Sequence, residues 1–278
     1  GHLATERPFS SFKLWKMINK LLNLEIKNFF WIFLTRKISR IFKIYFVFSA
    51  KNYLPKNNYP LHNLNLLFEN QYNNFHKNNF NFNKDLFHNL KGCFLKNKTI
   101  KILDYGGENL DLYLFLKKKF PKATIIVINQ KKLNNVLKNF IKKKKIKNIQ
   151  VFSDIKKINN IKLDLVYFGS SLQYMKNYEE ILKFLLKKKV KYFCISATSF
   201  FYSKKFNKKI ILKQVNLLPY TLYCYSFNFI HINSLFSKYG YKIMNKKFNP
   251  YKKINFRNFS IKIEYLNIQY KKLTSKIS

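Results

Sequence analysis

The residues best suited to chemistry lie together at the end of an apolar segment. The stretch "KILDYGGENLDLYLFLKK" (101–118) runs from apolar residues into Asp104 and then the pair Gly106 and Gly107. Glycine and acidic residues are scarce in this chain, which has only 6 glycines and 12 acidic residues. Asp104 and the nearby Glu108 are two of those acids. Glycine lets a backbone approach a ligand closely, and the N–H groups that begin a helix bind polar groups. The stretch therefore predicts a ligand-binding turn between a strand and a helix.

The spacing argues against a dinucleotide ligand. A Gly-x-Gly-x-x-Gly pattern is absent, and in a turn with glycine at every second position after Gly106 the further glycines would fall at Glu108 and Leu110. A pyrophosphate needs the close approach that those glycines allow, and Asp104 would repel phosphate. A ligand with a positive centre and no phosphate suits this turn better, and S-adenosylmethionine is such a ligand.

Short apolar segments alternate with segments of helical spacing around this turn. This alternation is typical of a parallel sheet covered by helices on both faces, and it predicts an α/β fold. Near the end of the chain we expect a helix closed by Gly240 and two further strands that are antiparallel. The expected parallel strands lie at 99–105, 123–130, 148–154, 163–171 and 190–198, and the expected helices at 111–120, 132–145, 178–189 and 232–239.

The chain divides into three predicted parts. Residues 1–50 form a basic amphipathic helical region, residues 51–98 a helical cap or lead-in, and residues 99–278 the α/β domain. Within the first part, residues 28–50 are apolar but carry four basic residues, so they are not expected to span a bilayer. We expect them to pack on the main domain or on a partner, with docking on a membrane surface as the alternative.

The charge of +42, from 54 basic and 12 acidic residues, would ordinarily indicate an anionic partner such as nucleic acid. Only Arg7, Arg36, Arg40 and Arg257 are arginines. The abundance of Lys, Asn, Ile, Phe and Tyr, whose codons are A/T-rich, indicates an AT-rich genome instead. Nucleic acid is therefore a disfavoured partner, although the field still attracts polyanions.

The cysteines indicate neither a disulfide framework nor a zinc site. Cys93, Cys194 and Cys224 are odd in number and lack metal-ligand spacing. The start of the chain has no apolar core of a signal peptide. We therefore expect a cytoplasmic protein without a bound metal, in contact with the inner membrane face if residues 28–50 dock there.

From about residue 100 to 263 the chain resembles class I S-adenosylmethionine-dependent methyltransferases. It is similar in particular to a methyltransferase family often met alongside bacterial surface-polysaccharide genes, with Asp-Tyr-Gly-Gly-Gly and Ser-Gly-Ser-Leu-Gln-Tyr motifs. "LDYGG" (103–107) and "FGSSLQY" (168–174) carry the resemblance. It implies a Rossmann-like, mostly parallel seven-stranded sheet with an N-terminal helical extension. The implied cofactor is S-adenosylmethionine, and the implied acceptor is a glycan or other small polar molecule.

The resemblance also assigns roles to residues of both motifs and of the strand ends. Asp104 and Asp154 have an alternative reading as helix caps, and Gln173 and Tyr174 as packing residues. His231, with Tyr220, is a candidate base or acceptor contact. The implied cofactor contacts are Asp104, Gly106, Gly107 and Glu108 at the methionine end, Asn129 at the ribose, Asp154 at the adenine, and Gly169, Ser170 and Leu172 beneath the cofactor, while Gln173 and Tyr174 face the methyl group or the acceptor.

Two other functions are considered, one because the chain departs from the family pattern and one because of its positive charge. Glu108, Leu110 and Asn129 depart from the family pattern, which favours a non-catalytic Rossmann-like protein acting as a binding or scaffold subunit. A nucleic-acid methyltransferase is disfavoured, because "GSSLQY" stands where base-amine methyltransferases carry an Asn-Pro-Pro-Tyr motif. The sequence does not predict an oligomeric state.

Overall fold

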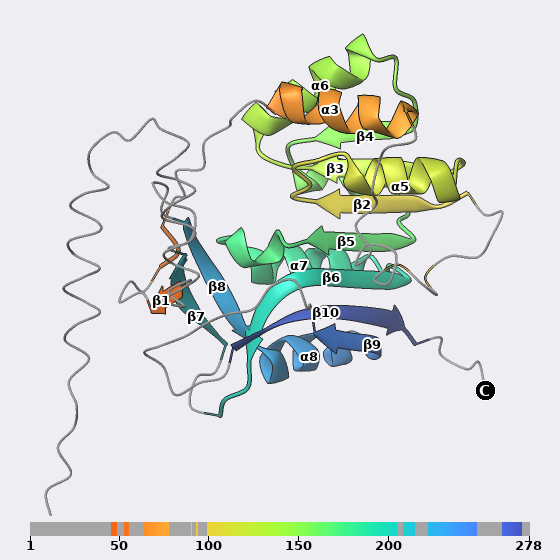
Figure 1. Ribbon diagram of the computed structural model, residues 1–278. Helices are drawn as coiled ribbons and strands as arrows, with labels where there is room; N and C mark the ends of the chain where they lie inside the picture. Colours follow the sequence, from red (N-terminus) through yellow and green to blue (C-terminus); the bar gives the residue numbers. More distant parts are fainter. Residues whose placement is uncertain are drawn as a thin grey trace, which may run out of the picture.

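The computed structural model describes residues 46–48, 53–55, 64–77, 90, 93, 99–204, 208–214, 222–248 and 263–273. In these residues the strands form a single 10-stranded sheet (Figure 1). Five neighbouring strands are parallel, in the spatial order β4, β3, β2, β5, β6. Successive strands are added on one side of β2 and then on the other, so the strand order reverses between β2 and β5. The parallel strands are β2 (Lys101–Tyr105), β3 (Thr124–Ile128), β4 (Ile149–Phe152), β5 (Leu165–Gly169) and β6 (Tyr192–Phe201).

Helices cover both faces of this sheet because the strands are apolar on both faces. Ile102 and Leu103 are adjacent in β2 and both fully buried, yet they enter different cores. Ile102 packs with α3, α5 and α6, and Leu103 packs on the side of α7 and α8. The helices are α3 (Leu64–His76), α5 (Asp111–Lys119), α6 (Lys131–Lys143), α7 (Tyr178–Lys187) and α8 (Phe229–Lys238), with short 3₁₀ helices η1 (Ile155–Ile158) and η2 (Leu172–Tyr174).

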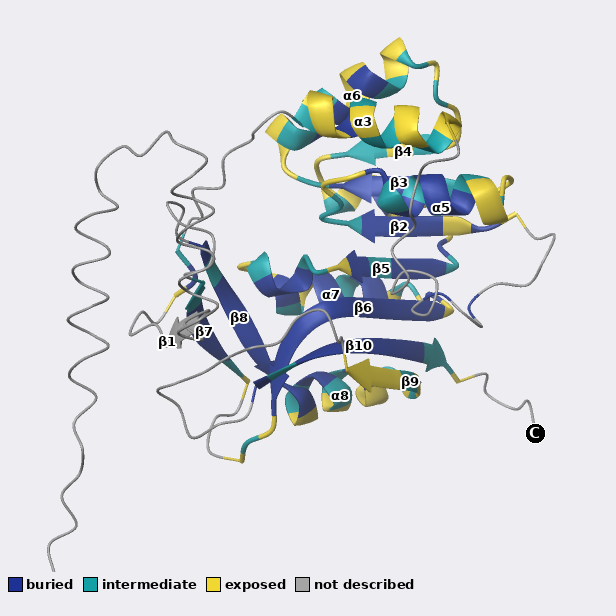
Figure 2. Ribbon diagram, viewed as in Figure 1, coloured by how far each residue is buried: buried dark blue, intermediate teal, exposed yellow. Residues whose placement is uncertain are grey.

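The last two strands confirm the predicted antiparallel end. Strand β10 (Ile263–Lys272) lies between β6 and β9 (Tyr241–Phe248) and is antiparallel to both. Gly240, with a φ of 74°, follows α8 and turns the chain into β9, as expected of a glycine at a helix C-terminus. Figure 2 shows β10 buried along most of its length and β9 exposed at the edge of the sheet.

Three further strands were not predicted. Strand β8 (Leu222–Asn228) pairs parallel with the last residues of β6, β7 (Lys209–Gln214) pairs antiparallel with β8, and β1 (Phe46–Phe48) pairs with β7. Strand β8 also packs against η2. In Figure 1, β7 and β8 run across the side of the sheet toward which the arrowheads of β2, β3 and β5 point. This extension, β1–β7–β8, therefore borders the carboxyl ends of the parallel strands.

A bend in β6 makes room for the extension. Ala197 has a φ of 48° in the middle of the strand, and the pairing with β10 shifts register between Leu266 and Ile268. The side chain of Asn267 lies at this shift and accepts hydrogen bonds from the Ala197 N–H (2.7 Å) and the Ser196 hydroxyl (3.1 Å). This bulge bends the strand, so that its end meets β8.

The predicted N-terminal parts are described only in places. Residues 46–48 belong to the stretch expected to be helical, and they form β1, because they pair with β7. Residues 1–45 lie outside the described residues, so membrane contact through residues 28–50 stays a prediction. Helix α3 provides a helical lead-in within residues 51–98. Among the described helices, none has the length and apolar character needed to cross a bilayer.

Candidate active site

Two loops flank the reversal of strand order and carry the predicted ligand-binding residues. In open α/β sheets, ligands bind beyond the carboxyl ends of the strands at such a switch point. Residues 106–110 leave β2 at this point, and residues 170–171 leave β5. The topology therefore brings both quoted motifs to the place where a ligand binds in this class of sheet.

Gly106 lets these two loops pack directly on each other. Its φ of 81° disfavours other residues, and its N–H donates to the Ile128 carbonyl of β3 at 2.8 Å. A Cβ at this position would lie 2.6 Å from the Cβ of Ser171. The Ser171 hydroxyl also donates a hydrogen bond to the Tyr105 carbonyl. The space beside Gly106 is thus occupied by Ser171.

Gly107 makes room for the carboxylate of Asp104. A Cβ on Gly107 would lie 2.2 Å from Asp104 Oδ2. Asp104 is only 6% exposed, and burial, with a smaller contribution from the charge of Asp111, raises its pKa to about 7. The central strand therefore ends in a carboxylate that changes its charge near neutral pH.

Further acids surround the same turn. Gln71 of α3 donates to Asp111 at 2.8 Å and accepts from the Leu110 N–H at 2.9 Å, so α3 fixes the start of α5. Loss of hydration raises the pKa values of Asp111 and of Glu108, although Glu108 itself reaches solvent. Three carboxylates thus lie within eight positions of a strongly basic chain, which favours a cationic ligand at this turn.

Asn129 and Asp154, predicted at the ribose and the adenine, lie at the ends of the next two strands. Asn129 donates from Nδ2 to the Gly107 carbonyl at 2.8 Å. Asp154 accepts from the Lys156 N–H at 2.9 Å and so caps η1, as its alternative reading expected. Burial raises the pKa of Tyr105 to about 12, and the negative charge of Asp154 adds to this shift. Both side chains keep hydrogen-bonding capacity beyond these contacts.

The loop after β5 contains the second motif (168–174) and includes a residue with strained backbone, Ser170. A Cβ on Gly169 would lie 2.7 Å from the ring of Tyr167. Ser170 has a φ of 63°, and its N–H donates to the Ser196 carbonyl of β6 at 2.9 Å. A serine at positive φ is uncommon and persists where its surroundings fix it, which is frequent at functional sites.

Leu172 and Gln173, predicted beside the cofactor and the acceptor, lie in the protein interior, which agrees with the alternative reading of Gln173 as a packing residue. Both side chains are completely buried. Leu172 belongs to the core on the α7 and α8 side. Gln173 accepts from the Ser199 N–H at 3.1 Å and hydrogen-bonds Tyr265, so its amide joins η2 to β6 and β10. Their contribution to a ligand site is therefore to hold the loop, since the surrounding protein covers their side chains.

Tyr174, the other predicted acceptor contact, is half-buried and joins η2 to the extension. Its hydroxyl donates to Gln214 Oε1 of β7 at 3.1 Å. Tyr174 also packs against a small core that includes Leu212 and Cys224 of the extension. The extension is thus fastened to the loop after β5 through a residue of the predicted site.

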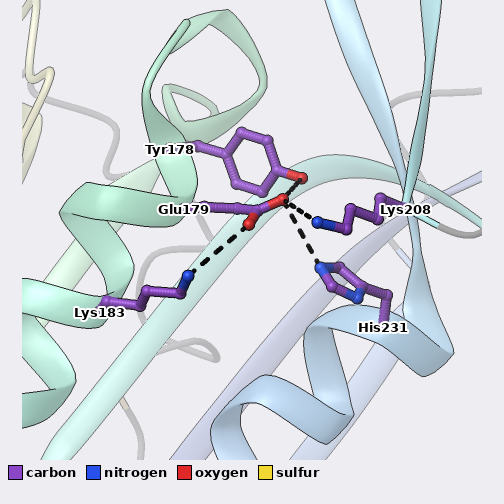
Figure 3. Close-up of polar contacts among 5 residues, drawn as sticks. All are labelled: Tyr178, Glu179, Lys183, Lys208 and His231. Carbon is purple, nitrogen blue, oxygen red and sulfur yellow. Dashed lines mark hydrogen bonds and ion pairs between the residues drawn. The ribbon is translucent and has the colours of Figure 1, made fainter.

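His231, in the first turn of α8, lies beside the first turn of α7. Figure 3 shows Glu179 surrounded by Tyr178, Lys183, Lys208 and His231. Glu179 Oε1 accepts from the Tyr178 hydroxyl at 3.0 Å and lies 3.8 Å from His231 Nε2. Burial and the two lysines lower the pKa of His231, whereas Glu179 raises it, and the net effect is a lowered pKa. No recorded contact among the described residues joins His231 to Asp104 or Tyr174, so its role as a base stays a prediction.

Three residues important to the site were not among the predicted contacts. Ser171 belongs to the quoted fourth-strand motif, and its packing on Gly106 could have been suspected there. No sequence pattern pointed to Gln71 or Gln214, because each forms its hydrogen bond with a residue 40 positions away in the sequence. In the part of the chain that the structure describes, no group of three or more His, Cys, Asp or Glu residues could hold a metal ion.

Comparisons with known proteins give a likeness in structure and none in sequence. No family model matches the chain, and no curated protein matches its sequence. A sarcosine dimethylglycine methyltransferase from Galdieria sulphuraria is similar over 68% of this chain and 84% of its own, with 11% identity and a TM-score of 0.50. The [4+2]-cyclase SpnF is similar over 68% of this chain and 80% of its own, with 7% identity and a TM-score of 0.49.

A third similar structure is an S-adenosylmethionine-dependent methyltransferase from Clostridium acetobutylicum. The similarity covers 73% of this chain and 97% of that protein, with 14% identity and a TM-score of 0.43. At these identities a likeness establishes fold alone. With its strand order and antiparallel last strand, the chain has the Rossmann-like fold of the methyltransferases, with β1, β7 and β8 added to it.

Proposed function

We propose that the protein transfers a methyl group from S-adenosylmethionine to a glycan or other small polar acceptor. The observation that carries the proposal is the buried Asp104 beside Gly107 at the switch point of the sheet. The cofactor has a positive sulfonium and a positive amino group, and the acids at this turn supply the opposite charge. The methyltransferase fold and the two sequence motifs support the same cofactor.

Each side chain of the site has a positioning role in this proposal. Asp104, Gly106 and Gly107 hold the methionine end of the cofactor, with Glu108 beside it. Asn129 binds the ribose and Asp154 the adenine. S-adenosylmethionine supplies an electrophilic methyl group, and the chain contributes by aligning the acceptor with it. Tyr174 and Gln214, which offer hydroxyl and amide groups, suit hydroxyl groups of a neutral polar acceptor.

Calorimetric titration with S-adenosylmethionine tests the proposal. We expect binding that strengthens as the pH rises from 6 to 8, because Asp104 then ionises. Asp104→Asn should weaken binding at pH 8 about tenfold or more and remove the pH dependence. Asp164→Asn, at the opposite end of the same strands, is the control and should bind as the wild type does. Tight binding that neither pH nor Asp104→Asn alters would contradict the proposal.

The alternative is a non-catalytic scaffold that has kept the fold without the cofactor. It is favoured by Ser171, which takes the space beside Gly106, and by Asn129, whose amide is engaged with the Gly107 carbonyl. A folded chain that gives neither heat nor a thermal shift with millimolar S-adenosylmethionine or S-adenosylhomocysteine would favour this alternative over the methyltransferase.

A further inference from the structure

We propose that Cys93 and Cys194 form a reversible disulfide that ties the segment before β2 to the centre of the sheet. Their sulfur atoms lie 3.8 Å apart in a buried environment, although the residues are 101 positions apart in the sequence. Sequence spacing could not indicate this pair, because Cys93 meets Cys194 of β6 only in the folded chain. The pair is independent of the proposed methyl transfer.

The two cysteines are held by different kinds of backbone contact. Cys194 lies within β6, opposite Tyr167 of β5 and Gln269 of β10, so pairing on both sides holds its backbone. Cys93 follows a turn in which its N–H donates to the Leu90 carbonyl at 3.1 Å. A disulfide bond is about 2.05 Å long, so the sulfurs must approach by roughly 1.8 Å. Bond formation requires that rotation of the two side chains supplies this approach.

The chemistry requires an added oxidant, such as a peroxide. Burial and the contact with Cys93 raise the pKa of Cys194, so little thiolate is present and we expect oxidation to be slow. With hydrogen peroxide, one thiolate attacks an oxygen atom to give a sulfenic acid and water. The second thiol then displaces that oxygen as a second water molecule. Two thiols are oxidised to one disulfide while the O–O bond of one peroxide is reduced.

Cys224 provides a matched control within the chain. It is also completely buried, but it lies in the separate core of the extension, with Phe201 and Leu212. Cys93 and Cys194 share the core beneath α3, α5 and α6. A specific disulfide should therefore form between those two and leave Cys224 as a thiol.

The test treats the full chain with hydrogen peroxide or diamide, blocks remaining thiols with N-ethylmaleimide and maps peptides without reduction. We expect a linked Cys93–Cys194 peptide and an alkylated Cys224. Because the link closes a loop of about 100 residues, the midpoint of thermal unfolding should rise by roughly 5 to 15 °C and return on adding dithiothreitol.

Serine variants separate this site from general oxidation. Cys224→Ser should keep the linked peptide and the thermal shift, whereas Cys93→Ser, outside the sheet, should lose both. If Cys194→Ser fails to fold, Cys93→Ser and peptide mapping of the wild type still decide. Three alkylated cysteines after oxidation, a link that involves Cys224, or a link without a rise in the unfolding midpoint would overturn the proposal.

Discussion

Asp104 links the stability of the fold to pH. Its pKa is about 7 in the folded chain and 3.8 for the unperturbed residue, so between these values the folded state holds a proton that the unfolded state has released. The contribution of this group to stability is therefore full below about pH 4 and is lost as the pH rises through 7. A bound cation beside the carboxylate would offset that loss.

Asp104→Asn removes this titration while keeping the shape of the side chain. We expect the variant to match the wild type in unfolding free energy near pH 4 and to exceed it at pH 8, by up to about 4 kcal/mol from the size of the pKa shift. Urea unfolding at a series of pH values measures the difference. Subtracting the Asp164→Asn control removes the general pH dependence, and a difference that shrinks as the pH rises would contradict this explanation.

Some residues of the site could be predicted because their types are rare and their place after a strand is informative. Asp104, Gly106 and Gly107 were singled out in this way, and the topology brings them to the switch point, while their contact with a ligand stays a prediction. The complete burial of Leu172 and Gln173 was harder to predict, because a short motif gives no indication of which side chains enter the core. Gln71 was missed, since its contact depends on how α3 packs on α5.

Among the elements, the bent β6 depends on one side chain. Asn267 is 7% exposed and satisfies the N–H of Ala197 at positive φ. Without it, that buried N–H lacks this acceptor, and the bulge that directs β6 toward β8 is weakened.

Asn267→Ala should lower the unfolding free energy by about 1 to 3 kcal/mol, the cost of an unsatisfied buried polar group. Ala197→Gly is the contrasting variant, because glycine accepts a positive φ without strain, and its stability should equal or slightly exceed that of the wild type. Equilibrium unfolding in urea measures both. Equal destabilisation by the two variants would show that the strand, rather than this hydrogen bond, determines the bend.

Hydrophobic periodicity predicted the parallel strands, the helices that cover them and the antiparallel end. Each of these elements is a long apolar or amphipathic segment whose pattern reflects its own burial. Strands β7 and β8 were missed, because their burial comes from packing on η2 and on the bent end of β6. Such contacts leave little trace in a short segment rich in lysine and tyrosine.

For the whole molecule, the charge of +42 opposes compaction through repulsion among basic side chains. Salt screens this repulsion, because the Debye length falls from about 10 Å at 0.1 M to about 3 Å at 1 M. We expect the midpoint of thermal unfolding to rise by a few degrees between 0.05 and 0.5 M sodium chloride. Sucrose at matched osmolality serves as the control, and a midpoint that falls with salt would show that attractive ion pairs dominate.

The contact between Gly106 and Ser171 has a consequence for protein engineering. The β-carbon of Ser171 occupies the space that a side chain on Gly106 would need. The loop after β2 and the loop after β5 therefore pack as one unit. A transplanted loop that carries a side chain in place of Gly106 would clash with Ser171 unless its partner loop came with it. Redesign of either motif therefore has to exchange both together.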